Sequence, residues 1–275
     1  MNADDVVMVP SADGTPIAAW KSGSGPTLVV VGGASADHTA WDSVVPLLSD
    51  AFTVYAMDRR GRGASGDGPS YAIEREFEDV AALVDALPGP VHLYGHSFGG
   101  ICAVEGAFRA RNVASLILYE GSPKPPGLRP IPDEFVARLD ELIERGDRED
   151  ALITFMLNGA GVASEELEVL RRHPAWRARI EAAHTIPREL RAFNDYGADM
   201  SRLRELDVPV LLILGSATDE RRRQMLEMFE GLASAFKDAR VAVLPGQRHA
   251  AHQTAPSLFA STIREFLSTL QLGAR

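Results

Sequence analysis

Residues 91–107 read VHLYGHSFGGICAVEGA, and the rest of the chain is organised around them. An apolar run rich in β-forming residues leads into a Gly-x-Ser-x-Gly pentapeptide, and a helical pattern of small residues follows. This order of strand, tight turn and helix predicts that Ser97 stands on a sharp turn as a nucleophile. Gly95 and Gly99 flank the serine because such a turn presses strand against helix and leaves no room for a Cβ. For the pentapeptide alone, a glycine-rich turn that merely starts a helix is the alternative interpretation.

The composition restricts the class of protein. The chain has 275 residues, of which 45% are hydrophobic and 24% charged, so it can bury a substantial core. A net charge of −10 argues against a nucleic-acid partner, because the phosphate backbone requires a positive surface. The single cysteine, Cys102, fits a reducing compartment and is expected to pack in the helix after Ser97. No secretory pattern or membrane-spanning run is recognisable. We therefore expect a cytoplasmic monomer or homodimer without a membrane partner.

Strand patterns alternate with helix patterns along the chain. Strands are predicted at residues 6–9, 16–20, 27–31, 52–57, 115–119, 208–214 and 240–244, and in the run that begins at residue 91. Helices are predicted at residues 41–48, 71–87, 98–107, 219–236 and 256–270. This alternation predicts an α/β fold in which a mostly parallel eight-stranded sheet carries helices on both faces.

The pattern changes after residue 121. Residues 121–132 contain five prolines, too many for a regular element. From residue 132 to about residue 206 the pattern is helical and charged, with no strand-like run. We therefore predict a core made of residues 1–121 and 207–275, and a helical cap of residues 122–206 over the edge of the sheet.

Four motifs give the chain a resemblance to the alpha/beta hydrolase superfamily, specifically to its small capped bacterial members of the serine esterase type. Residues 95–99 match the serine turn of that family, and residues 58–65 resemble its Asp-x-Arg-Gly-x-Gly-x-Ser loop. Residues 246–249, followed by Pro256, resemble its histidine loop. Residues 32–34, Gly-Gly-Ala, stand where the family usually has His-Gly and an oxyanion residue. The resemblance covers nearly the whole chain and implies a hydrolase that needs no metal or other cofactor.

The resemblance also implies which residues act with Ser97. A serine hydroxyl is a poor nucleophile at neutral pH unless a base takes its proton. His249 is the expected base, since its spacing to Pro256 is that of the family, and His252 is the competitor. We expect His96 to point away from the nucleophile in a supporting role.

Two carboxylates compete to orient the histidine. The commonest acid of the family follows the strand at residues 208–214, where Asp219 stands one residue late and also suits a helix N-cap. Other members carry the acid at the end of the strand after the nucleophile helix, where Glu120 stands. A carboxylate at that place needs a partner, because burying it alone is costly. We favour Glu120 and keep Asp219 as the alternative.

Binding residues follow from the same resemblance. The oxyanion hole is expected to use the backbone N–H groups of Phe98 and Ala34. The glycines at 32–33 lack the third glycine of a dinucleotide loop, so a nicotinamide cofactor is not expected. Aromatic residues of the cap are predicted to line an apolar substrate cleft, with plain packing as the alternative: Phe155, Trp176, Phe193 and Tyr196.

These residues together predict a serine hydrolase for a small, largely apolar carboxylic ester, thioester or lactone. In this prediction Ser97 attacks the carbonyl, His249 takes and returns the proton, and water releases the acyl group. A carbon–carbon bond hydrolase or lyase with the same residues is the alternative among enzymes. A non-catalytic small-molecule receptor is the alternative outside enzymes, because a fold does not fix a function.

Overall fold

A computed structural model describes residues 5–216 and 220–273. Its centre is an eight-stranded sheet with the order β1-β2-β4-β3-β5-β6-β7-β8. The strands are β1 (Val6–Pro10), β2 (Pro16–Ser22), β3 (Thr27–Val31), β4 (Thr53–Met57), β5 (Val91–His96), β6 (Val113–Tyr119), β7 (Val210–Gly215) and β8 (Ala239–Leu244). β2 pairs antiparallel with β1 and β4, and the strands from β4 to β8 run parallel. The mostly parallel sheet predicted from the sequence is confirmed.

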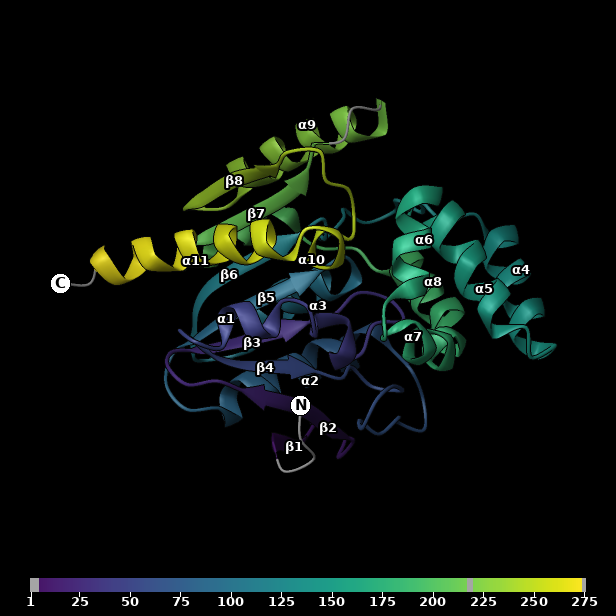
Figure 1. Ribbon diagram of the computed structural model, residues 1–275, viewed down its shortest axis with the longest axis horizontal. Helices are drawn as coiled ribbons and strands as arrows, with labels where there is room; N and C mark the ends of the chain where they lie inside the picture. Colours follow the sequence, from purple (N-terminus) through teal and green to yellow (C-terminus); the bar gives the residue numbers. More distant parts are fainter. Residues whose placement is uncertain (1–4, 217–219, 274–275) are drawn as a thin grey trace.

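Helices cover both faces of the sheet (Figure 1). One face packs against α2 (Ile73–Ala86), α3 (Phe98–Ala107) and α9 (Glu220–Ala235). The other packs against η2 (His38–Trp41), α1 (Val45–Leu48), α10 (Ala251–Thr254) and α11 (Pro256–Gly273). In β3 the side chains alternate between the two layers, with Val29 and Val31 on the first face and Leu28 and Val30 on the second. Burial on both faces explains why the central strands read as continuous apolar runs.

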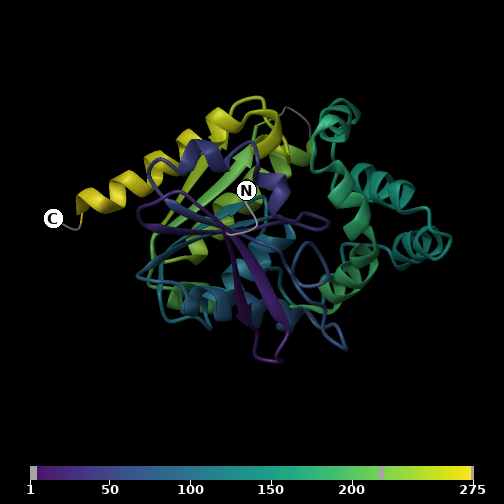
Figure 2. The same ribbon diagram turned by 60° about the horizontal axis from the view of Figure 1, so that its bottom comes forward.

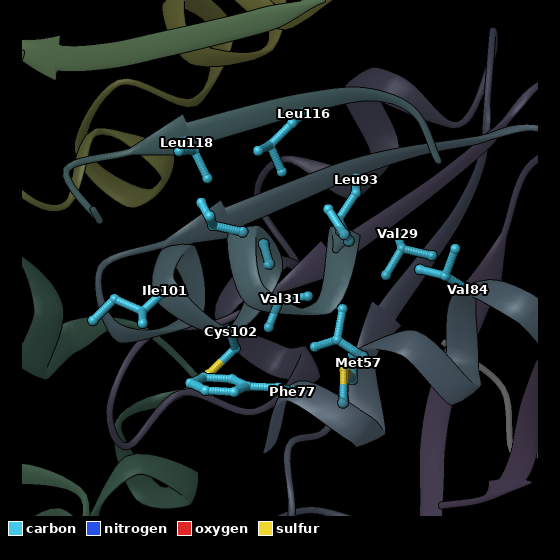
Figure 3. Packing of buried hydrophobic residues seen from close by; sticks show 14 of the residues in the cluster. Val29, Val31, Met57, Phe77, Val84, Leu93, Ile101, Cys102, Leu116 and Leu118 are labelled. Atoms are coloured by element: carbon cyan, nitrogen blue, oxygen red, sulfur yellow. The ribbon is translucent and has the colours of Figure 1, made fainter. Parts of the chain in front are cut away.

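Figure 3 shows the packing on the first face. Val31 of β3 and Met57 of β4 meet Phe77 of α2 and Cys102 of α3, all of them buried. Because burial raises the pKa of the Cys102 thiol well above its usual value, this cysteine is a packing residue, as its sequence context indicates.

The helices between β6 and β7 form a separate layer beside the carboxyl ends of the parallel strands (Figures 1 and 2). They are α4 (Asp133–Glu144), α5 (Arg148–Thr154), η3 (Phe155–Gly159), α6 (Ser164–Arg172), α7 (Trp176–Ala182), η4 (Ala183–Thr185), α8 (Ile186–Asp195) and η5 (Met200–Glu205). We call α4 to α8, with η3 and η4, the cap. Its buried side chains, such as Leu139, Leu152 and Ile186, form an apolar cluster that also includes Ala250 from the loop after β8. The cap therefore rests on the edge of the sheet where parallel strands end.

Within residues 5–216 and 220–273, no helix combines the length and the apolar character that a membrane span requires.

Candidate functional site

Ser97 stands on a strained turn between β5 and α3. Its φ of 54° and ψ of −124° lie where a residue with a side chain is held only at a cost. Its N–H donates a hydrogen bond to the carbonyl of Tyr119 at 2.9 Å. A Cβ added at Gly95 would lie 2.5 Å from the carbonyl oxygen of Gly99, and one added at Gly99 would lie 2.4 Å from that of Gly32. The two glycines are therefore required by the close approach of strand, turn and helix.

His249 and Glu120 meet at the same edge of the sheet. The Nδ1 atom of His249 lies 2.8 Å from Oε2 of Glu120. The other carboxylate oxygen, Oε1, accepts a hydrogen bond from the N–H of Gly215 at 2.9 Å, and the Glu120 N–H donates to the carbonyl of Ile213 at 3.1 Å. A φ of 45° turns Glu120 out of the strand direction. Because the carboxylate accepts a hydrogen bond from Nδ1–H, Nε2 is left as the basic nitrogen of the imidazole.

Ser97 and His249 line one cavity. Among the described residues the Ser97 hydroxyl makes no hydrogen bond to the His249 ring. Hydrogen bonds of this kind are often long in unliganded enzymes and shorten only when a substrate is bound. The turn after β5 and the loop after β8 therefore bring the candidate nucleophile and the candidate base into the same cavity.

The competitors for these roles are His252 and Asp219. His252 is 1% exposed and packs against Trp41, with ring centroids 4.8 Å apart, and against Phe259. Burial, followed by the neighbouring charges, lowers its pKa well below the usual value. His252 also lines the cavity, but the contact with Glu120 is made by His249. Asp219, the alternative acid, lies outside the described residues.

His96 does not point away from the nucleophile, and that prediction is wrong. The ring lines the cavity, and its Nε2–H donates to the carbonyl oxygen of His249 at 2.9 Å. It stacks on Tyr119 with a centroid separation of 5.1 Å. Because burial lowers the pKa of His96 well below its usual value, the ring is neutral at pH 7. It holds the backbone of the loop that carries His249.

The two amides expected to bind an oxyanion are available. Ala34 lines the cavity, and Phe98 is the first residue of α3, directly after Ser97. Within the described part of the chain neither N–H donates a hydrogen bond to the protein. At position 32, where the resembling family has a histidine, an added Cβ would lie 3.1 Å from the Cβ of Ala36, so the loop leaves little room for a side chain at Gly32.

Two buried arginines support this loop instead, which the sequence did not reveal. Arg59 and Arg62 donate to the carbonyl oxygen of Gly33 at 3.3 and 3.4 Å. Arg59 also lies over the ring of Phe98, 4.7 Å from its centroid. Glu189 of α8 accepts from both guanidinium groups. The loop of residues 58–65 is therefore a structural turn that also joins the cap to the backbone beside Ser97.

A cavity lies between the cap and the edge of the sheet. The empty space in and around it is about 420 Å³, a volume that includes adjoining open solvent. Its apolar wall comes mainly from the cap, with Phe155 and Met156 at the start of the π-helical turn η3. The residues around it are Gly33, Ala34, Ala36, His96, Ser97, Phe155, Met156, Ala160, Val162, Leu170, Arg179, His249, Ala250 and His252. Such a space suits a small and largely apolar molecule.

Of the four cap aromatics predicted to line the cleft, the structure places only Phe155 there. Trp176 packs inside the cap and its Nε1–H donates to Glu149 at 3.0 Å. Phe193 and Tyr196 pack against the core on the face of the sheet that α2 and α3 cover, and the Tyr196 hydroxyl donates to Glu105 at 2.8 Å. These three side chains do not line this cavity, because helical spacing identifies apolar faces without showing what each face contacts.

One cluster of possible metal ligands, Asp37, His38 and Asp58, has another explanation. Oδ1 of Asp58 accepts from the backbone N–H of His38 and from its Nδ1, both at 2.8 Å. Oδ2 accepts from Nε1 of Trp20 and the N–H of Ala64, both at 2.9 Å. Protein donors thus occupy the oxygens that a cation would need, and we interpret the cluster as a hydrogen-bonded turn.

Comparisons with known proteins identify the family to which the chain is similar. A family model described as the alpha/beta hydrolase family matches residues 28–262. A pimeloyl-[acyl-carrier protein] methyl ester esterase from Methylococcus capsulatus is 33% identical over 208 residues, which cover 70% of this chain and 77% of that protein. The structure of an alpha/beta hydrolase from Sphaerobacter thermophilus matches with a TM-score of 0.80 and 35% identity, and the match covers 95% of this chain and 100% of that one.

Another relative is similar only in part. The probable oxidoreductase EphD of Mycobacterium tuberculosis is 38% identical over 101 residues, which are 34% of this chain. The chain spans only 17% of the length of that protein. This similarity therefore concerns a segment and not the whole of either protein.

Proposed function

The chain belongs to the alpha/beta hydrolase family, and we propose that it is a serine hydrolase that cleaves a carboxylic ester through an acyl-enzyme at Ser97. One observation carries the proposal. Nδ1 of His249 lies 2.8 Å from the Glu120 carboxylate, while the same imidazole shares a cavity with a serine held at a φ of 54°. Nucleophile, base and orienting carboxylate are the parts that acyl transfer requires.

Each group has a defined task in this mechanism. The Ser97 hydroxyl attacks the ester carbonyl as His249 Nε2 takes its proton, and the imidazolium then protonates the leaving alcohol. Glu120 keeps the proton on Nδ1 and stabilises the imidazolium. The N–H groups of Ala34 and Phe98 bind the oxyanion, aided by the partial positive charge at the start of α3. Water, activated by His249, then hydrolyses the acyl-enzyme.

The choice of an ester has separate support. The relative from Methylococcus capsulatus is an esterase for a methyl ester, and it is similar over most of both chains. The small cavity with an apolar cap wall suits a low-molecular-weight acyl or alcohol group. The same residues also serve carbon–carbon bond hydrolysis. Covalent labelling of Ser97 therefore does not distinguish the two reactions, and ester turnover must be measured as well.

A fluorophosphonate probe tests the nucleophile directly. We expect it to label the purified chain and not Ser97→Ala, and we expect that substitution to lower kcat for p-nitrophenyl esters by roughly 10⁴- to 10⁶-fold. Ser261→Ala is the matched control, since Ser261 is exposed on α11 and donates only to the carbonyl of Leu258. Unchanged ester turnover in a folded Ser97→Ala protein would refute the proposal. Labelling without turnover of any ester would instead favour carbon–carbon bond chemistry.

A further inference from the structure

The cavity beside Ser97 contains one guanidinium group among the described residues that line it. It belongs to Arg179 of α7, and the residue is only 7% exposed. The rest of the wall is mostly apolar, and its polar side chains are Ser97, His249, His96 and His252. Burial keeps His96 and His252 neutral at pH 7. A buried cation in such surroundings is costly unless a negative charge accompanies it.

Arg179 lacks the partner that the other buried arginines have. Arg59 pairs with carboxylates at 2.9 Å and Arg60 with one at 2.6 Å, and both side chains are 0% exposed. No carboxylate oxygen of the described residues lies within ion-pair distance of the Arg179 guanidinium. Its one hydrogen bond runs from Nη2 to Oε1 of Gln253 at 3.4 Å, which is long. The protein thus keeps a largely unused cation at the cavity wall.

The Arg179 side chain is nevertheless protonated at neutral pH. Burial lowers the pKa of Arg179 to about 10, and the charge of Asp37 acts in the opposite direction. Oδ1 of Asp37 accepts hydrogen bonds from the N–H and the hydroxyl of Thr39 at 3.0 and 2.5 Å. Asp37 acts on Arg179 only from beyond ion-pair distance, so it does not neutralise the guanidinium by direct contact.

A second polar side chain of the same cavity wall is also without a partner. Both ring nitrogens of His252 are buried and find no hydrogen-bond partner among the described residues. A neutral imidazole has one N–H to donate. Arg179 and His252 together offer N–H donors in the cavity that also contains Ser97.

We propose that the substrate carries a free carboxylate, which Arg179 binds with help from His252. The enzyme then cleaves a small ester whose acyl or alcohol part bears this free carboxylate. The inference rests on the proposed ester hydrolysis and names the substrate class of that site. A planar guanidinium matches the two oxygens of a carboxylate with two parallel N–H groups. A phosphate dianion fits less well, because the single guanidinium of Arg179 does not balance two negative charges.

Kinetics on matched esters test the preference. The panel contains monoethyl esters of dicarboxylic acids of four to eight carbons, each against the neutral ethyl ester of the same acyl length. It also contains acetate esters of ω-hydroxy acids against acetates of simple alcohols. We expect the charged member of at least one pair to have the higher kcat/KM. Arg179→Met should lower this value by roughly 30- to 1,000-fold, the usual loss for one partner of a buried charge pair, and leave the neutral ester within about threefold.

Controls separate charge from structure. Arg177→Met changes an arginine of the same helix whose side chain is 90% exposed, and it should leave all substrates unchanged. Arg179→Lys keeps the charge and should recover part of the lost preference. Since an unpaired buried charge destabilises the fold, Arg179→Met should raise the melting temperature of the unliganded protein. A lowered melting temperature in Arg179→Met, together with no charged-ester preference anywhere in the panel, would overturn the proposal.

Binding tests the inference independently of turnover. Ser97→Ala in the presence of the preferred monoester should melt at a higher temperature, and Ser97→Ala with Arg179→Met should not. If this Arg179-dependent stabilisation occurs while Ser97 proves not to be a nucleophile, the carboxylate site stands and the proposed function fails. If inorganic phosphate stabilises the protein through Arg179 and no carboxylate does, the carboxylate assignment is overturned.

Discussion

Nδ1 of His249 lies 2.8 Å from Oε2 of Glu120, which follows the last residue of β6. The contact joins the end of β6 to the loop after β8, two elements with β7 between them. The N–H of Gly215, the last residue of β7, donates to the other oxygen of the same carboxylate. The carboxylate is thus fixed by the middle strand and presented to the imidazole.

The first prediction concerns this carboxylate. Glu120→Gln should lower kcat for esters by about 10⁴-fold, because the imidazole loses the acceptor that fixes its tautomer and stabilises its charged form. Ester turnover together with a circular dichroism spectrum of the folded protein measures the effect. Asp219→Asn is the matched comparison and should keep activity within about tenfold. A large loss in Asp219→Asn with little loss in Glu120→Gln would transfer the role to Asp219.

The second prediction concerns the buried ion pairs under the cap. Glu189 is 0% exposed and accepts from both Arg59 and Arg62. Burial opposes its charge, but the two guanidinium groups outweigh burial and lower the pKa of Glu189. Glu189→Gln leaves Arg62 without its carboxylate, so we expect the free energy of unfolding to fall by about 3–5 kcal/mol in chemical denaturation.

A surface pair provides the control for Glu189. Glu181, whose side chain is 65% exposed, pairs with Arg177 at 3.1 Å, and Glu181→Gln should cost less than about 1 kcal/mol. Because the same arginines donate to the Gly33 carbonyl beside Ser97, Glu189→Gln should also lower kcat. Equal stabilities of the two variants would show that the buried network contributes nothing beyond a surface pair.

The sequence was sufficient to predict the sheet and the tight turn that carries Ser97. Buried parallel strands appear in the sequence as apolar runs. The glycines on either side of Ser97 stand where an added Cβ would collide with backbone oxygens. The position of Glu120 was also predictable, because a carboxylate that ends a buried strand needs a partner. These features depend on local sequence and on the order of strands.

The cap was predictable only as a set of helices. Trp176 and Phe155 both lie on apolar faces, yet Trp176 packs inside the cap while Phe155 reaches the cavity. Which face meets the cavity depends on how the helices cross one another, and single-sequence periodicity does not contain this information. For the same reason the sequence does not predict that Arg179 lines the cavity, because it is one of many charged residues of a helical segment.

The third prediction follows from this difference between cap aromatics. Phe155→Leu should change the ratio of kcat/KM between long and short acyl esters by about tenfold, because the smaller side chain enlarges the cavity. Phe193→Leu is the control, because Phe193 packs against the core. This substitution should change kcat/KM by the same factor for all esters. An acyl-length panel of p-nitrophenyl esters measures both. A shifted ratio in Phe193→Leu alone would place the acyl group elsewhere.

The last prediction concerns acid stability and His252. Burial, followed by neighbouring charges such as that of Arg179, lowers the pKa of His252 in the folded protein well below 6.5. The unfolded chain therefore takes up a proton as the pH falls below about 6.5, and the folded chain does not. Stability is present above that pH and is lost as the pH falls. Between pH 7.5 and 5.5 one such histidine removes up to about 1.4 kcal/mol.

His252→Phe should remove this part of the pH dependence. The phenyl ring keeps the contacts with Trp41 and Phe259 but has no proton to gain, and it avoids two buried nitrogens without partners. We expect the free energy of unfolding of the variant to fall by about 1 kcal/mol less than that of the unchanged protein over the same pH range. Above pH 7.5 the difference between the two proteins should be constant, which is the internal control. Parallel curves down to pH 5.5 would mean that folding does not keep His252 neutral.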